Sequence, residues 1–293
     1  MRVLITGCHG QVGSCLTEQL ANNENVTVLA LDRQRLDITN QDAVNAVVTE
    51  FRPSVIINAA AHTAVDKAEE EVALSYAINR DGPKYLAQAA QTIGAAILHI
   101  STDYVFEGNK VGDYIETDTT NPQGVYGESK LAGEIAVAQS CEKHIILRTA
   151  WVFGENGNNF VKTMLRLAEN RDTLSVVGDQ FGGPTYAGDI ANTLVQIAKR
   201  INQGDTVDYG VYHYSGLPHV SWFEFADAIF DVAIEQHFLT KKPDLISISS
   251  VQYPTPAKRP NNSRLSTEKI SRVFAIEASD WVSNLKKVIF SND

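Results

Sequence analysis

Short runs of apolar, often β-branched residues alternate with longer stretches of helical periodicity up to about Arg200. Each run is nearly continuous in apolar side chains, as is typical of parallel strands that are covered on both faces. The predicted strands are Val3–Thr6, Val26–Leu31, Val55–Ala59, Ala96–Ser101, His144–Thr149 and Leu174–Val177. The stretches between them predict helices at Gln41–Phe51, Leu74–Ile93, Tyr126–Gln139 and Phe160–Asn170.

The pattern loosens after about Arg200, where the predicted elements are shorter and less regular. They are Val211–Tyr214 as a strand, Trp222–Phe238, Thr267–Val273 and Trp281–Ile289 as helices, and a proline-containing stretch at Pro243–Pro260. The alternation predicts an α/β fold, a Rossmann-type doubly wound parallel sheet with a smaller C-terminal lobe over the strand ends, where such sheets bind ligands. We assign residues 1–150 and roughly 173–205 to the sheet domain, and roughly 151–172 and 206–293 to the lobe.

Charge narrows the range of partners. The 293-residue chain carries a formal net charge of -10, which repels phosphate backbones and anionic lipid, so neither nucleic acid nor a membrane is expected as partner. No apolar run reaches the roughly 18 residues that span a bilayer. Cys8, Cys15 and Cys141 are odd in number and form no CxxC pair, which favours a reducing cytoplasm.

A glycine-rich turn directly follows the first predicted strand. Gly7, Gly10 and Gly13 have the spacing GxxGxxG, with Gln11 and Val12 between the last two. One glycine permits a sharp turn, another lets the backbone approach a pyrophosphate, and the third lets helix and strand pack closely. Because the turn follows a strand and opens a helix, it predicts a dinucleotide site at the helix N-terminus.

The second predicted strand is followed by Asp32, about 20 residues beyond the last glycine, which completes the dinucleotide fingerprint. Its carboxylate would accept hydrogen bonds from an adenosine ribose and oppose a 2′-phosphate, whereas Arg33 would attract that phosphate. The cofactor is therefore NADPH or NADH, with the preference open. Asp37 and Ile38 could flank the adenine, although Asp37 could equally cap a helix or a turn.

Small residues follow the third predicted strand in the segment 58–63, Asn-Ala-Ala-Ala-His-Thr. They would leave room for a cofactor against the backbone, and tight packing of helix on sheet would call for the same residues.

Tyr126 and Lys130 lie four residues apart at the start of a predicted helix, which puts them on one face. A nearby cation favours the phenolate, so we expect Lys130 to lower the pKa of Tyr126. Tyr126 would then give a proton to a developing alkoxide, while Lys130 reaches the nicotinamide ribose. An exposed tyrosine beside a surface lysine would show the same spacing, but the position between strands four and five favours catalysis.

The fourth predicted strand ends in Ser101 and Thr102. A hydroxyl there could donate to the same substrate oxygen as Tyr126, which would give the alkoxide two donors. Alternation along a strand points only one of the two into the cleft, and we choose Thr102. The alternative is a hydroxyl that caps a backbone group.

Eight segments together resemble the extended short-chain dehydrogenase/reductase family, and within it reductases of dTDP-linked keto sugars. The resemblance covers nearly the whole chain, and the first and fourth segments belong to the wider superfamily. The segments are GCHGQVG at 7–13, NAAAHTAVDKAE at 58–69, STDYVF at 101–106, VYGESKLAGE at 125–134, RTAWVFG at 148–154, NNFVKTMLRLA at 158–168, DQFGGPT at 179–185 and PAKRPNNSRL at 256–265.

The resemblance implies reduction of the C4 ketone of dTDP-4-dehydro-L-rhamnose by NAD(P)H. It implies Thr102, Tyr126 and Lys130 as the catalytic trio. Cofactor contacts would come from Gly10, Gln11, Val12, Asp32, Asp37, Ile38, Ala61, His62 and Thr63. The sugar nucleotide would contact Thr102, Asp103, Tyr126 and Trp151.

Three further residues have a rationale of their own. Trp151 follows the fifth strand, where an aromatic face could cover a sugar, or where a tryptophan could fill the core between the lobes. Arg259 and Arg264 lie in a Pro/Asn-rich segment of an acidic chain. Their guanidinium groups suit diphosphate oxygens, although surface arginines of a loop would look the same.

One position departs from the family pattern. Some members form dimers bridged by magnesium on glutamates, one of them two residues beyond the third glycine, where this chain has Cys15. A thiol is a poor ligand for a hard cation, although Asp189 could still replace another of those acids. We therefore expect no resident metal and no magnesium-bridged dimer, while a homodimer of another kind stays open.

Two other functions fit the same residues. One is a reductase or epimerase that acts on a different nucleotide sugar, and an epimerase would keep its cofactor rather than consume it. The other is a non-catalytic regulatory subunit on the same fold, which the presence of all three trio residues disfavours.

Overall fold

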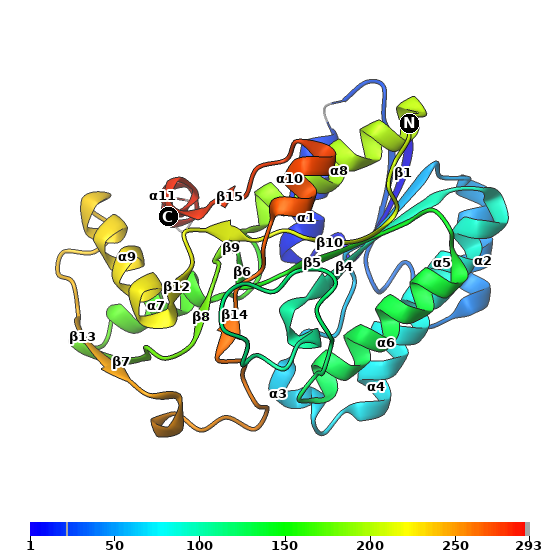
Figure 1. Ribbon diagram of the computed structural model, residues 1–293. Helices are drawn as coiled ribbons and strands as arrows, with labels where there is room; N and C mark the ends of the chain where they lie inside the picture. Colours follow the sequence, from blue (N-terminus) through cyan, green and yellow to red (C-terminus); the bar gives the residue numbers. More distant parts are fainter. Residues whose placement is uncertain (22, 291–293) are drawn as a thin grey trace.

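The largest element of the protein, seen in a computed structural model that describes residues 1–21 and 23–290, is a six-stranded parallel sheet (Figure 1). Its order is β10–β5–β4–β3–β1–β2, and every neighbouring pair is parallel. The predicted doubly wound parallel sheet is confirmed. The strands are β1 (Arg2–Thr6), β2 (Thr27–Leu31), β3 (Val55–Asn58), β4 (Ala96–Thr102), β5 (His144–Thr149) and β10 (Gly210–His213).

Helices cover both faces of this sheet, because alternate side chains of each strand point to opposite sides. Val3 and Ile5 of β1 pack into one core with α1, α8 and α10, whereas Leu4 packs into another with α2, α5 and α6. Figure 1 shows the two helical layers on either side of the strands. The helices are α1 (Gln11–Ala21), α8 (Ala187–Gln203), α10 (Glu268–Phe274), α2 (Gln41–Phe51), α5 (Gly82–Ile93) and α6 (Val125–Ser140).

The predicted helix Leu74–Ile93 is interrupted by a π-helical turn, η1 (Ala77–Asp81). Pro83 stands in the first turn of α5 and has no N–H to continue a regular helix from the residues before it. Such turns are frequent at functional sites. The turn carries Asn79, whose side chain contacts the predicted cofactor segment. Two short helices precede it, α3 (Val65–Ala68) and α4 (Val72–Tyr76).

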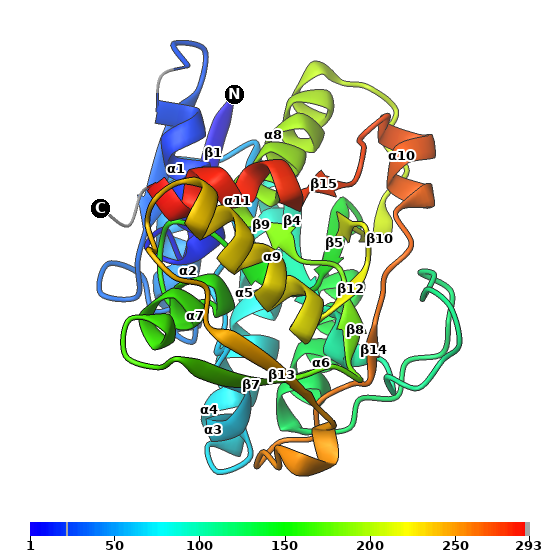
Figure 2. The same ribbon diagram turned by 90° about the vertical axis from the view of Figure 1, so that its left-hand side faces the viewer.

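The C-terminal lobe has a core of its own, built on Phe153, Phe225, Phe230 and Trp281. Figure 2 shows its helices and the long strand pair from the side. They are α7 (Phe160–Ala168), α9 (Trp222–Glu235), α11 (Trp281–Phe290), and the parallel pair β7 (Thr173–Val177) and β13 (Asp244–Ile248).

Short strands and single turns complete the fold around the lobe. A three-stranded sheet has the order β12–β8–β14, and β6 pairs with β9 as β11 pairs with β15. Their bounds are β12 (Val220–Ser221), β8 (Phe181–Gly182), β14 (Asn262–Ser263), β6 (Val152–Phe153), β9 (Thr185–Tyr186), β11 (Gly216–Leu217) and β15 (Ser279–Asp280), with 3-10 turns at η2 (Asp103–Val105) and η3 (Ser250–Gln252).

Two strands lie elsewhere than the pattern predicted. The expected strand 174–177 pairs with β13 and not with the large sheet. The strand beside β5 at the edge of that sheet is β10, at residues that the prediction gave to the lobe. Leu174 and Val176 are buried while Thr173 and Ser175 are exposed, which suits a strand covered on one face only. The division of the chain into two binding domains stays a prediction.

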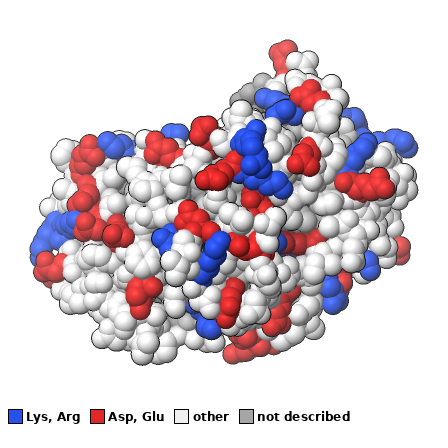
Figure 3. Space-filling model, viewed as in Figure 1, with Lys and Arg blue, Asp and Glu red and all other residues white. Residues whose placement is uncertain are grey.

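The surface carries charges of both signs. On the face in Figure 3, lysine and arginine side chains are interspersed with aspartate and glutamate. Within the described part of the chain, no helix combines the length and the apolar character needed to cross a membrane.

Candidate active site

The predicted site residues follow the carboxyl ends of β1, β3 and β4, which meet at one edge of the sheet. The strand order reverses between β1 and β3, because β2 lies on the other side of β1. A reversal of this kind leaves a crevice for a ligand outside the strand ends. The fold therefore brings the glycine turn, the segment after Asn58, and Thr102 to the same edge.

The glycine turn has no room for side chains at two positions. Gly7 has a φ of +73°, and a Cβ there would lie 2.6 Å from the Ala60 nitrogen. A Cβ on Gly13 would lie 2.0 Å from the Gly7 carbonyl oxygen. The helix α1 begins at Gln11, and the first N–H groups of a helix have no partner within it. This backbone cradle fits a pyrophosphate.

Asp32 is partly buried just beyond β2. One carboxylate oxygen accepts the Arg35 N–H at 2.9 Å, and the other lies 3.4 Å from His9 Nδ1. Arg33 is exposed beside it. A carboxylate and an exposed guanidinium thus stand side by side at the end of β2.

Asp37 holds a turn. Its Oδ1 accepts the Thr39 N–H at 3.0 Å and the Thr39 hydroxyl at 2.8 Å, and these hydrogen bonds lower the pKa of the carboxyl. Asn40, not Asp37, caps helix α2. Ile38 is buried, and a Cβ on Gly82 would lie 2.6 Å from its side chain. The turn role of Asp37 is therefore the one that the contacts show.

The segment Ala61–Thr63 is held in place by hydrogen bonds of its middle residue, His62. The His62 N–H donates to the Asn79 side chain at 2.8 Å, and His62 Nε2 lies 3.0 Å from a Glu71 carboxylate oxygen. Asn79 in turn donates to the Ser129 hydroxyl at 3.0 Å. The π-helical turn thus ties the predicted cofactor segment to helix α6, which carries Tyr126.

Thr102 and Tyr126 contact each other. The Thr102 hydroxyl lies close enough to the Tyr126 phenol to lower its pKa. It donates to Asp103 Oδ1 at 3.1 Å and accepts the Tyr104 N–H at 3.2 Å. The Ser101 hydroxyl is buried and has no partner among the described residues. Thr102 is therefore the strand-end hydroxyl that faces the phenol.

Burial sets the proton affinity of Tyr126. It raises the pKa of the phenol well above its ordinary value, while the Thr102 hydrogen bond lowers it and Asp103 raises it further. Lys130 does not contribute to this pKa shift. The raised pKa of the phenol is opposite in direction to the shift expected from Lys130, because burial outweighs the other influences.

Lys130 is only 2% exposed, and its Nζ donates to the Ile100 carbonyl at 2.7 Å. It also lies 3.5 Å from His99 Nε2. Burial lowers the pKa of Lys130 to about 8, against the opposing charge of Glu134. That carboxylate forms a buried two-point ion pair with Arg148, with distances of 2.9 and 2.7 Å.

Asp103 is a buried carboxyl beside the trio. Burial raises its pKa to about 6, although hydrogen bonds with Ser263 and Thr102 lower it. The Ser263 hydroxyl donates to Asp103 Oδ2 at 2.5 Å. A residue of the C-terminal lobe therefore reaches directly to the end of β4.

Arg259 and Arg264 both lie at the rim of this site. Arg259 donates to the Tyr104 hydroxyl at 3.1 Å and to Asp66 at 2.6 Å, and the Tyr104 ring meets the Tyr126 ring edge-on at 5.3 Å. Arg264 follows Ser263 in the chain, and its Nε donates to the Asn262 side chain at 2.9 Å. Neither is a free surface arginine.

Trp151 joins the two lobes. It is partly buried, packs against the core of the lobe and against the cluster around Phe106, and stacks on Trp222 with ring centroids 3.5 Å apart. A Cβ on Gly182 would lie 2.6 Å from the indole ring. Trp151 therefore fills the core between the lobes, which was one of its two predicted roles. Its contact with a sugar stays a prediction.

Comparison with known proteins places these residues in a family. A family model described as RmlD substrate binding domain matches residues 1–292. A dTDP-4-dehydrorhamnose reductase of Aggregatibacter actinomycetemcomitans is 55% identical over 287 residues, 98% of each chain. A crystal structure of a dTDP-4-dehydrorhamnose reductase from Clostridium acetobutylicum has a TM-score of 0.92 and 42% identity, and the match covers 99% of both chains. The chain belongs to the dTDP-4-dehydrorhamnose reductase (RmlD) family.

A second structure of the RmlD family bears on the cofactor. The dTDP-4-dehydrorhamnose reductase of Bacillus anthracis, solved in complex with NADP, is 39% identical with a TM-score of 0.91, and the match covers 99% of this chain and 98% of that one. The resemblance drawn from the eight sequence segments is therefore confirmed.

Sequence reasoning about this RmlD-family chain missed the buried polar partners of the trio. His99 and Asn58 lie behind Lys130, Ser263 bonds Asp103, and Arg148 holds Glu134. A signal was present for two of them, because His99 and Arg148 interrupt apolar strands. Polar side chains in such runs need partners when buried.

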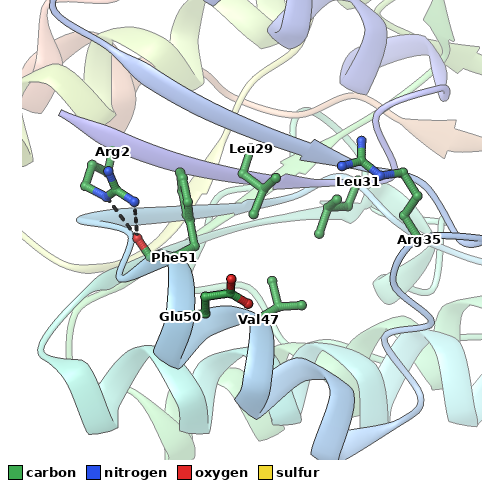
Figure 4. Close-up of a pocket in the computed structure, with 7 residues that line it drawn as sticks. All are labelled: Arg2, Leu29, Leu31, Arg35, Val47, Glu50 and Phe51. Carbon is green, nitrogen blue, oxygen red and sulfur yellow. Dashed lines mark hydrogen bonds between the residues drawn. The ribbon is translucent and has the colours of Figure 1, made fainter.

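Two hollows on the surface of this RmlD-family protein lie apart from the trio. Figure 4 shows one of about 450 Å³ between β2 and α2, where Arg2 donates twice to the Phe51 carbonyl and Arg35 lies at the other end. Another, of about 420 Å³, lies between α5 and α6. Neither is lined by Thr102, Tyr126 or Lys130.

Proposed function

We propose that the protein reduces the C4 ketone of dTDP-4-dehydro-L-rhamnose to dTDP-L-rhamnose with NADPH or NADH. Membership of the RmlD family supports this activity. The observation that carries it is the placement of the Thr102 hydroxyl beside the Tyr126 phenol at the end of β4, at the same sheet edge as the glycine turn after β1.

The glycine turn fits a dinucleotide site, because Gly7 and Gly13 let the turn pack directly against backbone, where a Cβ would collide, and the turn leads into helix α1. When bound, the nicotinamide cofactor supplies the hydride. Its proposed contacts follow the strand ends in chain order. They are Gly7, Gly10, Gln11, Val12, Gly13, Asp32, Arg33, Asp37, Ile38, Ala61, His62, Thr63, Tyr126 and Lys130.

Tyr126 acts as the proton donor in this scheme. Its raised pKa keeps the phenol protonated at neutral pH, which is the state that a donor needs. Thr102 lies beside the phenol, and by turning its one O–H from Asp103 to the substrate oxygen it would add a second donor as negative charge develops there. Lys130 lies one turn along the same helix and can return a proton to Tyr126.

The sugar nucleotide would lie against the lobe. Its proposed contacts are Thr102, Asp103, Tyr126, Trp151, Arg259 and Arg264. The two arginines are the cations at the rim, and a guanidinium can exchange a carboxylate partner such as Asp66 for diphosphate oxygens. This is the basis for proposing residues 1–150 and roughly 173–205 as cofactor domain, and roughly 151–172 and 206–293 as sugar-nucleotide lobe. We propose the cytoplasm as its compartment, since three unpaired cysteines suit reducing conditions.

The test is NADPH oxidation with dTDP-4-dehydro-L-rhamnose. One NADPH should be consumed for each ketone reduced, and Tyr126→Phe should lower kcat by about a hundredfold to ten-thousandfold while NADPH still binds. Tyr253→Phe is the matched control, because this tyrosine is 60% exposed, and it should leave kcat unchanged. Turnover of the sugar without loss of NADPH would indicate an epimerase, and full activity of Tyr126→Phe would contradict the trio.

A further inference from the structure

A chain of buried polar side chains runs behind Lys130 and has no part in the scheme above. The Thr6 hydroxyl donates to Asn58 Oδ1 at 2.7 Å, and Asn58 Nδ2 lies 2.9 Å from His99 Nδ1. His99 Nε2 then lies 3.5 Å from Lys130 Nζ. The four side chains are 0 to 2% exposed and come from β1, β3, β4 and α6.

One backbone N–H group determines where the protons lie along this row of buried side chains. The Ala60 N–H, which can only donate, points to Asn58 Oδ1 at 3.1 Å. The oxygen of the amide is therefore fixed on that side, and the amide NH₂ faces His99 Nδ1. Nδ1 must accept, so a neutral imidazole carries its proton on Nε2. Burial and the Lys130 charge keep the pKa of His99 well below its usual range, so the ring stays neutral.

The Nε2 proton points toward Lys130 Nζ. An ammonium group has only donors, whereas a neutral amine has a lone pair that can accept this N–H. Both the ammonium and the neutral amine can donate the hydrogen bond from Nζ to the Ile100 carbonyl. The tautomer of His99 therefore favours the amine over the ammonium.

We propose that His99 is a positioning residue that Thr6 and Asn58 hold in the Nε2–H tautomer, and that it thereby lowers the proton affinity of Lys130. The tautomer and its effect on Lys130 are independent of the proposed function. Only the catalytic consequence rests on it. A lysine with reduced proton affinity passes its proton more readily to Tyr126 after the phenol has protonated the substrate oxygen.

Other groups also face Lys130 and need to be separated from His99. The charged group among them is Glu134 on α6, which raises the Lys130 pKa and forms an ion pair with Arg148 of β5. Asp103 acts on Tyr126 rather than on the ammonium. A test must therefore change the imidazole tautomer and leave these groups in place.

The first experiment reads the tautomer in the intact protein and needs no activity. In protein labelled with ¹⁵N-histidine, the imidazole signal that disappears in His99→Phe should show a bare Nδ1 and a protonated Nε2 from mildly acidic to mildly alkaline pH. A proton on Nδ1, or titration of the ring in this range, would overturn the proposal.

The second experiment inverts the tautomer. In Asn58→Asp a carboxylate takes the place of the amide NH₂, so His99 must carry its proton on Nδ1 and turn the Nε2 lone pair toward Lys130. The Lys130 pKa, followed by NMR of labelled lysine and by the alkaline limb of kcat, should rise by roughly one unit or more.

The new charge alone also raises this pKa, so the same change is made in the His99→Phe background. There the shift should be less than half as large, and equal shifts in both backgrounds would show that the imidazole transmits nothing. His213→Gln, which removes another fully buried imidazole, should leave the Lys130 pKa unchanged. If the NMR results hold but NADPH is not consumed, the proposed function fails and the role of His99 stands.

Discussion

At the scale of single residues, Lys130 and Tyr126 share one face of α6 but have different surroundings. The Lys130 ammonium is enclosed and donates to a backbone carbonyl, whereas Tyr126 is a partly buried residue whose phenol lies beside Thr102. Desolvation disfavours the charged form of each group, so it raises the pKa of the phenol and lowers that of the ammonium. The two shifts move the pKa values of Tyr126 and Lys130 apart, which the YxxxK spacing alone does not reveal.

This difference predicts the pH profile of the reaction. Tyr126 stays protonated throughout the neutral and mildly alkaline range, because its pKa is raised, so of these two residues Lys130 loses its proton first. As pH rises through about 8, where the pKa of Lys130 lies, the ammonium is lost and kcat should fall. Steady-state rates at saturating NADPH and sugar nucleotide measure this. A kcat that stays level up to the ordinary pKa of lysine would contradict it.

Cofactor preference is also decided by single residues. Arg33 is the exposed cation beside Asp32, and it would attract a ribose 2′-phosphate. Arg33→Ala should raise the KM for NADPH about tenfold, the equivalent of about 1.4 kcal/mol, and leave the KM for NADH unchanged. Arg35→Ala is the matched control, since that guanidinium already donates to the Ala30 carbonyl. Equal changes for both cofactors would show that Arg33 does not meet the phosphate.

At the scale of elements, the apolar runs predicted the inner strands of the sheet well. Four of the expected strands are buried on both faces, and such strands have few alternatives. The strand at β10 was predicted, but its place in the large sheet was not, because β7 and β10 are both short and nothing local says which partner each will find. The π-helical turn had a local signal in Pro83, but its position depends on packing. A Cβ on Gly133 of α6 would lie 2.0 Å from the Asn79 carbonyl.

The same limit applies to the candidate site. Motifs placed Thr102, Tyr126 and Lys130 correctly at a strand end and on one helix face. Spacing along the chain could not show that His99 lies behind Lys130, or that Ser263 reaches Asp103, because these contacts join segments far apart in the sequence.

Helix α6 is fastened to strand β5 by the buried pair of Glu134 and Arg148. Glu134→Gln would leave a buried guanidinium without its counter-ion, so the free energy of unfolding should fall by about 3–5 kcal/mol. Urea unfolding of both proteins measures the difference. Glu235→Gln breaks an exposed pair with Lys286 and should cost less than about 1 kcal/mol. A buried pair no more costly to break than the exposed one would mean that Arg148 finds other partners.

At the scale of the whole molecule, the C-terminal segment is what closes the site. Figure 2 shows the chain returning through β14 to the neighbourhood of β8 and the ends of the sheet. There it supplies Arg259 to Asp66 and Ser263 to Asp103. The sequence pattern predicts a lobe above the strand ends, but the tertiary fold decides which of its residues reach across.

Assembly is the remaining property at this scale. Cys15 is buried, and burial raises the pKa of its thiol to about 12, so it stays neutral at the position where a metal-bridged dimer would need an acid. Asp189 already accepts hydrogen bonds from Ser279 at 2.6 Å and Asn284 at 2.8 Å. Across residues 1–21 and 23–290, no group of three or more His, Cys, Asp or Glu side chains could hold a metal ion.

We therefore expect the same molecular mass in magnesium and in a chelator, measured by equilibrium sedimentation over a range of protein concentrations. A thiol without charge offers a hard cation almost nothing, and a carboxylate that bonds a hydroxyl and an amide would have to release both before it could bind magnesium. A dimer that dissociates on chelation would show that other carboxylates bridge the subunits. A dimer of equal mass in both buffers would place the contact elsewhere on the surface, on faces that need no metal.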